Sequence, residues 1–337
     1  ILNPGKEAGL IDADLEITEG KLANFTVSAD NTGGTLTGRN RLTGIAKLND
    51  LTGAGDRLTV IGNITNQELH AGIIEYKRPI GISGLIASGS ITLSDYQISD
   101  KLVSLGIKGN SQSYEAGLSY PILLNFGRNI YADLSVADKH FSTTMVDEQR
   151  KEIVAEKIGL RGSIQDSFIK GASNFGSIYY FNGEVMPGLG YTDTAHTTYQ
   201  KISYSLTRVQ SLPQGFSLKL SLNGQVSHGA LDGSEGFSLG GATAVRAYNP
   251  SAFYANDGYV FTTELNKDIA NLGAPGVLKS SIFYDQGTST YDTVYGGTNN
   301  LQGAGFSLAL QKWGWYELKT TYAHRIGKST PGNLIDD

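Results

Sequence analysis

Few residues in this sequence of 337 have the type and spacing that chemistry at an active site requires. Gly327-Lys328-Ser329-Thr330 resembles the end of a phosphate-binding loop, but the glycine that should open such a loop falls at Tyr322, inside an expected strand. Cysteine is absent, no G-x-S-x-G motif occurs, and no Ser/His/Asp set can be assembled from spacing. No metal site is expected from the five scattered histidines, which lack i,i+4 or cysteine partners: His70, His140, His196, His228 and His324. We therefore predict no enzyme, no cofactor and no metal.

Composition and charge narrow the remaining classes of protein. Glycine is frequent at 43 residues, tyrosine outnumbers phenylalanine 18 to 12, and proline is scarce at 8, which is typical of strands joined by many turns. The net charge of −5 comes without a basic cluster, so no nucleic-acid partner is expected. No run of 18 apolar residues occurs, which excludes a transmembrane helix.

Alternation of apolar and polar residues is the dominant pattern of the chain. In residues 216–227, apolar Phe216, Leu218, Leu220 and Leu222 alternate with Ser, Lys and Asn residues. Because successive side chains of a strand point to opposite faces, such a segment predicts a strand with one apolar and one wet face. Segments of this kind, separated by turn sequences, predict fifteen strands near residues 21–30, 40–49, 56–66, 68–78, 84–95, 110–122, 126–140, 150–163, 168–180, 198–210, 214–228, 258–269, 277–288, 303–313 and 315–327. The charge run at 148–152 is expected to lie in a solvated turn.

The polar face of these segments is rich in Ser, Thr, Asn and Lys, which suits a water-filled lumen. A soluble β-sandwich would instead pack its apolar face in a shared core. We therefore predict an all-β, transmembrane, antiparallel β-barrel whose apolar face meets lipid. Tyrosines near the strand ends are expected to form an aromatic girdle at the membrane surface: Tyr76, Tyr96, Tyr120, Tyr179, Tyr180 and Tyr259.

The count of fifteen strands is odd, whereas a single-chain bacterial barrel normally has an even number, because its first strand closes against its last. We therefore expect about 16 strands, with the last one beyond Asp337 and missing from this chain. Alternatively, the odd count arises because one strand was divided into two, or two strands were joined into one, in this assignment. Since no signal peptide opens the sequence at Ile1, we expect a targeting segment to have been removed.

Between the strands ending near His228 and beginning near Gly258 lies a loop of almost thirty residues, a length that usually marks function. Within it, Phe237-Ser238-Leu239-Gly240-Gly241 is followed by Val245-Arg246-Ala247-Tyr248. This pair of motifs resembles the signature of two-partner secretion transporters, the haemolysin and filamentous haemagglutinin exporters. The resemblance implies a long loop that folds inward into the lumen, with a Val-Arg-Gly-Tyr or Val-Arg-Gly-Phe tip. Ala247 departs from that pattern, and an alanine forced to positive φ would strain the tip by about 1 kcal/mol.

Other segments carry the same resemblance over most of the chain. Residues 30–38 resemble the family's first hairpin and residues 49–56 its second turn. Phe283-Tyr284-Asp285-Gln286-Gly287 resembles the family's F-x-D-x-G motif, which implies that Asp285 points inward and pairs with Arg246. Alternation agrees, since apolar Leu278, Ile282 and Tyr284 face lipid when Phe283, Asp285 and Gly287 face the lumen. An ordinary lumenal ion pair without a gating role is the plainer interpretation of Arg246 and Asp285.

The resemblance also implies domains, location and partners. Residues 1–20 are expected to be the end of a periplasmic POTRA-type domain, and residues 21–337 the barrel in the Gram-negative outer membrane. The implied function is export of a partner exoprotein (a haemolysin, adhesin or contact-dependent toxin) through the lumen, with the loop as a latch. Outer-membrane lipid and lipopolysaccharide would surround the barrel, which we expect to be a monomer. The alternatives are a passive porin-like channel, an outer-membrane protein assembly factor and a soluble adhesin-type β-structure.

Overall fold

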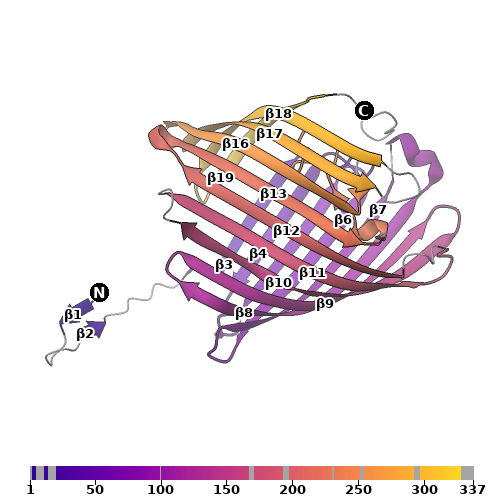
Figure 1. Ribbon diagram of the computed structural model, residues 1–337, viewed down its shortest axis with the longest axis horizontal. Helices are drawn as coiled ribbons and strands as arrows, with labels where there is room; N and C mark the ends of the chain where they lie inside the picture. Colours follow the sequence, from indigo (N-terminus) through magenta and orange to yellow (C-terminus); the bar gives the residue numbers. More distant parts are fainter. Residues whose placement is uncertain are drawn as a thin grey trace.

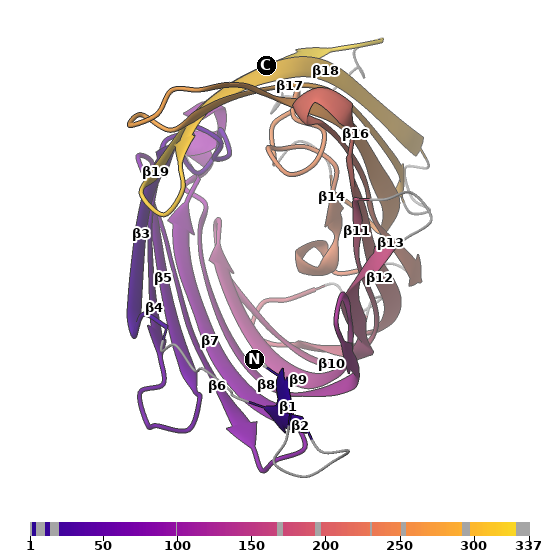
Figure 2. The same ribbon diagram turned by 90° about the vertical axis from the view of Figure 1, so that its left-hand side faces the viewer.

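The protein folds into one large antiparallel sheet that curls into a barrel wall (Figures 1 and 2). The computed structural model describes residues 2–4, 11–13, 20–98, 100–166, 171–192, 197–229, 231–250, 254–291 and 297–327. The sheet contains fifteen strands in sequence order, each paired with its neighbours along the chain. They are β3 (Ala23–Asp30), β4 (Arg41–Asn49), β5 (Arg57–Thr65), β6 (Leu69–Ile80), β7 (Leu85–Gln97), β8 (Lys108–Asn125), β9 (Arg128–Thr144), β10 (Glu148–Asp166), β11 (Ala172–Pro187), β12 (Thr198–Ser211), β13 (Phe216–His228), β16 (Asp257–Asn271), β17 (Val277–Tyr291), β18 (Gly297–Lys312) and β19 (Tyr316–Arg325).

The remaining described elements are short. Two pairs of small strands stand outside the large sheet: β1 (Leu2–Pro4) with β2 (Ile11–Ala13), and β14 (Phe237–Ser238) with β15 (Tyr254–Ala255). The described residues also form three 3₁₀ turns: η1 (Asp100–Leu105), η2 (Pro213–Gly215) and η3 (Gly233–Glu235). In the described part of the chain, no helix is long and apolar enough to cross a bilayer.

The fifteen predicted strands and the fifteen strands of the sheet correspond one to one, which confirms the all-β antiparallel prediction. Their lengths are less well predicted. β11 runs to Pro187 where the prediction stopped at 180, and β18 begins at Gly297 rather than 303. The solvated turn expected at 148–152 is wrong, because Glu148 already begins β10 and pairs with Thr144 of β9. Strand pairing therefore extends through polar sequence that local alternation alone does not mark as a strand.

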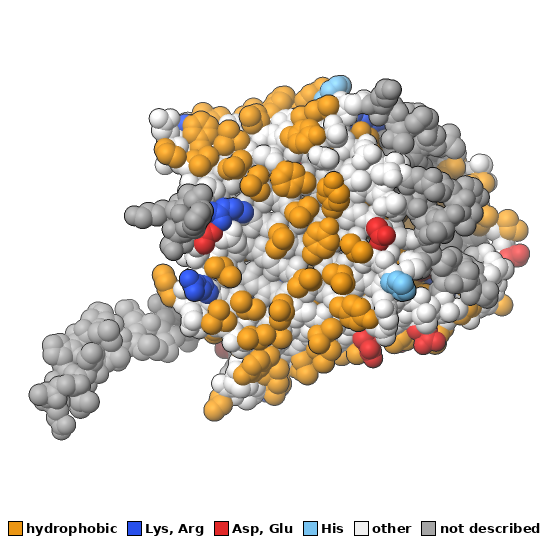
Figure 3. Space-filling view, viewed as in Figure 1, with side chains coloured by type: hydrophobic (Ala, Val, Ile, Leu, Met, Phe, Trp, Pro, Cys, Tyr) orange, Lys and Arg blue, Asp and Glu red, His pale blue; other side chains and the backbone are white. Residues whose placement is uncertain are grey.

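The two faces of the sheet differ as the alternation predicted. Large apolar side chains lie on the outer face, and no second sheet covers them. Six examples are between 49% and 61% exposed: Leu134, Ile158, Ile178, Leu206, Ile282 and Phe306. Figure 3 shows such side chains spread over the middle of the wall, with charged groups toward its two ends. A soluble sandwich would bury this face, so the soluble adhesin-type alternative is wrong.

The inner face is polar and ion-paired. Lys157 Nζ of β10 lies 2.7 Å from Glu115 Oε1 of β8, across the intervening β9. Arg161 Nε of β10 lies 2.8 Å from Asp133 Oδ2 of the neighbouring β9. Tyr179 also faces inward and donates its hydroxyl to Asp133 at 2.9 Å. The prediction that Tyr179 belongs to an outer aromatic girdle is therefore wrong. Tyr179 and Tyr180 are consecutive residues of β11, so their side chains point to opposite faces of the sheet. Tyr180 faces lipid, and Tyr179 supplies a hydroxyl donor to the polar lumen.

The two ends of the barrel are unequal. At one end the strands join through short turns, such as residues 81–84, 126–127 and 313–315. At the other end lie the longer connections, residues 31–40, 98–107 and 229–256 among them. Barrels of this kind have short periplasmic turns and longer extracellular loops, so the second end is the extracellular one.

The sheet ends on β3 and β19, which Figure 2 shows on the same side of the ring. In the described residues, no hydrogen-bonded pairing joins these two strands. The sixteenth strand expected beyond Asp337, like Lys328-Ser329-Thr330 and His196, lies outside the described residues. The same holds for most of residues 1–20, of which only the backbone pairing of β1 with β2 is described, so a POTRA-type ending there stays a prediction.

Candidate functional site

The long loop of residues 229–256 leaves β13 at the extracellular end and returns to β16. Figure 2, which looks into the barrel, shows β14 of this loop inside the ring of strands. Its burial agrees, since Leu239 and Val245 have no exposed surface. The loop therefore folds inward into the lumen, as the resemblance implied.

A compact backbone turn shapes the tip of the loop. The amide of Val245 donates to the carbonyl of Leu239 at 3.0 Å, and Gly240 forms a parallel bridge with Val245. A Cβ on Gly240 would stand 2.2 Å from the carbonyl oxygen of Asn249, and Gly241 has φ of +113°. Only glycine meets both conditions without strain, so this Gly-Gly pair fixes the direction in which the tip points.

The tip carries Arg246 to two carboxylates of the barrel wall. Its Nε donates to Asp285 Oδ2 at 2.8 Å and its Nη2 to Asp285 Oδ1 at 2.9 Å, which is a bidentate pair. Its Nη1 donates to Glu264 Oε2 of β16 at 2.6 Å. The guanidinium also lies 3.4 Å from the centroid of the Phe283 ring. The pairing of Arg246 with Asp285 is thus present, whereas Glu264 is a second partner that sequence reasoning missed.

This cluster is withdrawn from solvent. Asp285 is fully buried, and the side chains of Arg246 and Glu264 are 12% and 13% exposed. Burial by itself would lower the pKa of Arg246, but the hydrogen bond and charge of Asp285, followed by those of Glu264, raise it above its usual value. Asp285 also accepts from the backbone amide of Arg246 at 3.1 Å and from Thr262 Oγ1 at 3.0 Å. Removing one partner of so buried a pair typically costs about 3–5 kcal/mol.

Apolar packing adds to the ion pair. Leu239, Val245 and Tyr248 of the loop form a buried cluster with Val260 and Leu301 of the wall. Most apolar side chains of a barrel wall point to lipid. This apolar cluster lies inside the lumen because the loop covers the inner wall there. Fully burying a side chain such as Leu239 or Val245 contributes about 1.5–3 kcal/mol.

Two glycines of the wall make room for the tip. A Cβ on Gly287 would stand 2.8 Å from Val245 Cγ2, and a Cβ on Gly303 would stand 2.9 Å from the Cβ of Ala247. Gly287 faces the lumen, as alternation predicted, and the neighbour that approaches it is the side chain of Val245. Gly303 was not singled out, because a glycine inside a strand pattern has no distinguishing neighbour in the sequence.

The strain expected at Ala247 is absent. Positive φ outside glycine is confined, in the described residues, to Asp50, Glu68 and Gln214. Ala247 instead sets its methyl group beside Gly303, and its carbonyl accepts from Arg325 Nε at 3.1 Å. The premise that this position needs a left-handed backbone is wrong, and alanine fits it.

The base of the loop, near η3, is held by a second charged cluster on the opposite part of the wall. Lys151 of β10 lies 2.5 Å from Asp232, and Lys139 of β9 and Lys201 of β12 lie 2.5 Å and 2.8 Å from Glu235. Sequence reasoning missed these contacts, because a lumenal lysine looks the same whether or not a loop carboxylate meets it.

The base carboxylates are among the most buried polar groups of the described chain, at 6% exposure for Asp232 and 4% for Glu235. Burial would raise the pKa of Asp232, but its hydrogen bonds from Lys151 and Ser234 outweigh burial and lower it. Burial would likewise raise the pKa of Glu235, but the charges and hydrogen bonds of Lys139 and Lys201 outweigh burial and lower it. Both groups therefore hold the loop as carboxylates.

The loop also contacts both ends of the sheet. Beyond the tip, Asn249 Nδ2 donates to Thr35 Oγ1 at 2.7 Å, in the connection that follows β3. On the other side, Arg325 of β19 donates to Ala247 and stacks 4.7 Å from the ring centroid of Tyr248. The docked loop thereby bridges the first hairpin and the last described strand.

One group of side chains outside the loop has metal-ligand chemistry. Asp138, His140 and Glu152 place their donor atoms within 4.8 Å of one another on the outer face of β9 and β10. His140 Nε2 lies 3.2 Å from Asp138, and its Nδ1 lies 3.9 Å from Glu152. Both ring nitrogens are thus already directed at carboxylates, an arrangement that an ion pair explains without a metal.

An apolar outside, a polar lumen and a long loop docked on the inner wall are the features of an outer-membrane β-barrel. The chain belongs to the haemolysin secretion/activation protein ShlB/FhaC/HecB family, whose family model matches residues 9–310. It is 28% identical over 305 residues to the heme/hemopexin transporter protein HuxB of Haemophilus influenzae strain 86-028NP, covering 86% of this chain and 53% of that protein. The chain thus spans about half the length of this curated relative.

Solved structures show the same fold. CdiB from Escherichia coli matches with a TM-score of 0.76 at 19% identity, over 96% of this chain and 66% of that one. CdiB from Acinetobacter baumannii matches with 0.73 at 17% identity, over 94% and 58%. BamA from Haemophilus ducreyi lacking POTRA domains 1–3 matches with 0.69 at 13% identity, over 95% and 69%. The protein is therefore a β-barrel of the Gram-negative outer membrane, and these likenesses speak for its fold alone.

Proposed function

We propose that this barrel exports a partner exoprotein across the outer membrane through its lumen, and that the loop of residues 229–256 is a latch that must leave its docked position first. The observation that carries the proposal is the contact of Arg246 with Asp285 and Glu264, which holds a loop from the extracellular end against the inner wall. The docked loop lies inside the lumen through which the client would have to pass.

The two charged clusters suit a latch because they are discrete and reversible. The tip cluster joins Arg246 to β16 and β17, and the base cluster joins Asp232 and Glu235 to β9, β10 and β12. Breaking either leaves charges that water can solvate once the loop has moved. A difference of a few kcal/mol between docked and undocked states is enough for a ligand or client to shift the population. Folding of the client outside the cell would supply direction.

The likeness to HuxB bears on the class of client. HuxB is named as a heme/hemopexin transporter, and this chain is 28% identical to it over 305 residues. Among the exoproteins that the family suggests, a client concerned with heme or hemopexin is therefore favoured over a contact-dependent toxin.

The competing functions give different results. A passive porin would conduct steadily and export nothing, and it offers no role for a loop held by buried ion pairs. An assembly factor would insert other barrels into the membrane, but the likeness to BamA, at 13% identity, extends to the fold alone.

A secretion assay separates these functions. The protein is expressed with the exoprotein encoded beside it, and the amount of that exoprotein in the medium is measured for wild type, Arg246→Ala and a matched control, Arg161→Ala. Arg161 is also a lumenal arginine paired with an aspartate, but it joins two wall strands and does not contact the loop. A latch has to close again as well as open, and a tip without Arg246 cannot re-dock on Asp285 and Glu264. We therefore expect Arg246→Ala to impair secretion while heat-modifiable migration stays intact, and Arg161→Ala to secrete normally. Unchanged export by Arg246→Ala would remove the latch from the mechanism, and no export by wild type would remove the proposed function.

A further inference from the structure

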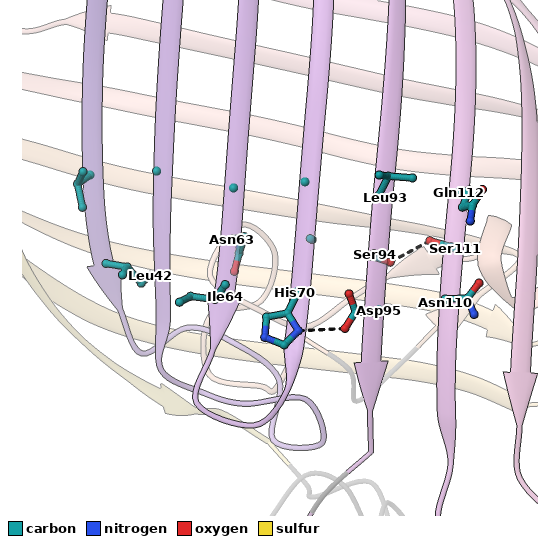
Figure 4. Close-up of a pocket in the computed structure, with 15 residues that line it drawn as sticks. Leu42, Asn63, Ile64, His70, Leu93, Ser94, Asp95, Asn110, Ser111 and Gln112 are labelled. Atoms are coloured by element: carbon teal, nitrogen blue, oxygen red, sulfur yellow. Dashed lines mark hydrogen bonds and ion pairs between the residues drawn. The ribbon is translucent and has the colours of Figure 1, made fainter.

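A hollow lies on the outer face of the wall across β3 to β8 (Figure 4). Its floor is a row of three glycines in register on neighbouring strands, because Gly44 pairs with Gly62 and Gly62 pairs with Gly72. All three belong to the apolar outer face, in phase with Val60 and Ile74. Without side chains at these positions, the wall is indented by a space of about 680 Å³.

Apolar side chains form the borders of the hollow. Val27 pairs with Gly44 on one side, and Leu93 pairs with Gly72 on the other, so they continue the glycine row in both directions. Leu42 and Ile64, labelled in Figure 4, line the hollow beside them, and each is about half exposed at 47% and 48%. The hollow is therefore an apolar depression in the lipid-facing surface of the barrel.

Toward the extracellular end the lining becomes polar. His70 Nδ1 lies 2.9 Å from Asp95 Oδ2, a pair that Figure 4 shows near the ends of β6 and β7. Beyond it lies a second space of about 440 Å³, which shares His70, Asp95 and Asn110 with the first and adds Glu68 and Lys108. The two spaces adjoin at these shared residues, and their lining changes from apolar toward the membrane centre to polar toward the extracellular surface.

This depression faces the outer leaflet, because its polar part lies at the end of the barrel that carries the long loops. The outer leaflet of a Gram-negative outer membrane consists of lipopolysaccharide, whose saturated acyl chains hang from a phosphorylated sugar. An acyl chain fits the apolar hollow in polarity. Lys108 offers a cation to a phosphate, while Asp95 and Glu68 can accept from sugar hydroxyls and amides.

We propose that the glycine-floored hollow of β4 to β6 is a binding site for one lipopolysaccharide molecule, with an acyl chain over Gly44, Gly62 and Gly72 and the sugar headgroup at His70, Asp95 and Lys108. The site is continuous with the membrane-facing belt and does not depend on the proposed export function. It would hold one lipid at a defined place beside the first strands of the barrel.

The test fills the hollow without disturbing the wall. A Cβ on Gly62 or Gly44 meets no atom within 4 Å, so Gly62→Val and Gly44→Val can be accommodated in the strands. Gly89→Val is the matched control, because Gly89 lies on the outer face of β7, has the same open surroundings and does not line the hollow. Heat-modifiable migration verifies that each purified variant is folded.

Binding of lipid A and, separately, of phosphatidylethanolamine is then titrated by native mass spectrometry. We expect wild type and Gly89→Val to bind one lipid A tightly, and Gly62→Val and Gly44→Val to bind it roughly tenfold more weakly, the factor expected when about two methylene groups lose contact. Equal affinity for lipid A in all four proteins would overturn the proposal, as would an equal loss in Gly89→Val. Phosphatidylethanolamine bound as tightly as lipid A, with the same response to filling, would overturn the assignment to lipopolysaccharide.

Discussion

Removing the side chain of Arg246 should release the loop tip without unfolding the barrel. In Arg246→Ala, the fully buried Asp285 loses both bonds of its bidentate pair and Glu264 loses its cation. Asp285 keeps only neutral donors, the amide of residue 246 and Thr262. Breaking a buried pair in this way costs about 3–5 kcal/mol. Because every 1.4 kcal/mol is tenfold, the ratio of undocked to docked loop should rise about 150-fold to about 5,000-fold.

Hydrogen exchange of the detergent-solubilised protein measures this ratio directly. The amide at position 246 reports on docking, since in wild type it donates to a carboxylate of the wall rather than to the loop itself. We expect exchange in peptides that cover residues 239–248 to accelerate in Arg246→Ala by up to the factor above, while strand amides keep their protection. Arg161→Ala should leave the loop unchanged, because its pair is within the wall and its side chain is 45% exposed.

A double substitution tests the assigned cause. Adding Asp285→Asn to Arg246→Ala replaces the unpaired buried charge with a neutral amide, so part of the lost protection should return. Loop exchange within about threefold of wild type in folded Arg246→Ala would refute the reasoning, because a loss that small is the size expected of a solvated surface pair.

Three further outcomes follow from the same contacts. Gly303→Val should push the tip away and accelerate loop exchange, because its Cβ would stand 2.9 Å from that of Ala247 and overpacking costs about 1–3 kcal/mol; preserved protection would show that the wall yields instead. Ala247→Gly should change loop protection by less than about 1 kcal/mol, measured by the same exchange, because the alanine adopts no strained backbone. A nitroxide on Gly233→Cys, a unique and exposed labelling site, should gain mobility in electron paramagnetic resonance spectra as pH falls below about 4. The pKa values of Asp232 and Glu235 are lowered in the docked loop. Their contribution to the stability of the docked state is therefore complete above the undocked pKa values and is lost as pH falls through the docked ones. A spectrum unchanged down to pH 2 would contradict this.

Much of the barrel wall could be predicted from the chain, because the relevant signal is local. Alternation with period two assigns each residue to lipid or lumen from its immediate neighbours, and it placed Asp285 inward and Ile282 outward correctly. The resemblance of residues 237–248 to a known family implied the inward loop, and that of residues 283–287 implied the pairing of Arg246 with Asp285. Strand ends were predicted less well, because pairing continues wherever a neighbouring strand is present, even through charged sequence such as residues 148–152.

The remaining features arise from contacts between segments that are far apart in the chain. Lys139 meets Glu235 across 96 residues, and Asn249 meets Thr35 across 214. Neither partner shows in its own sequence that the other is near, since any lumenal lysine suits a polar lumen equally well. The sequence by itself determined which way each strand residue points, because that depends on neighbours one and two residues away. Only the tertiary structure decided what each residue meets there, because the loop path and the register of fifteen strands bring those groups together.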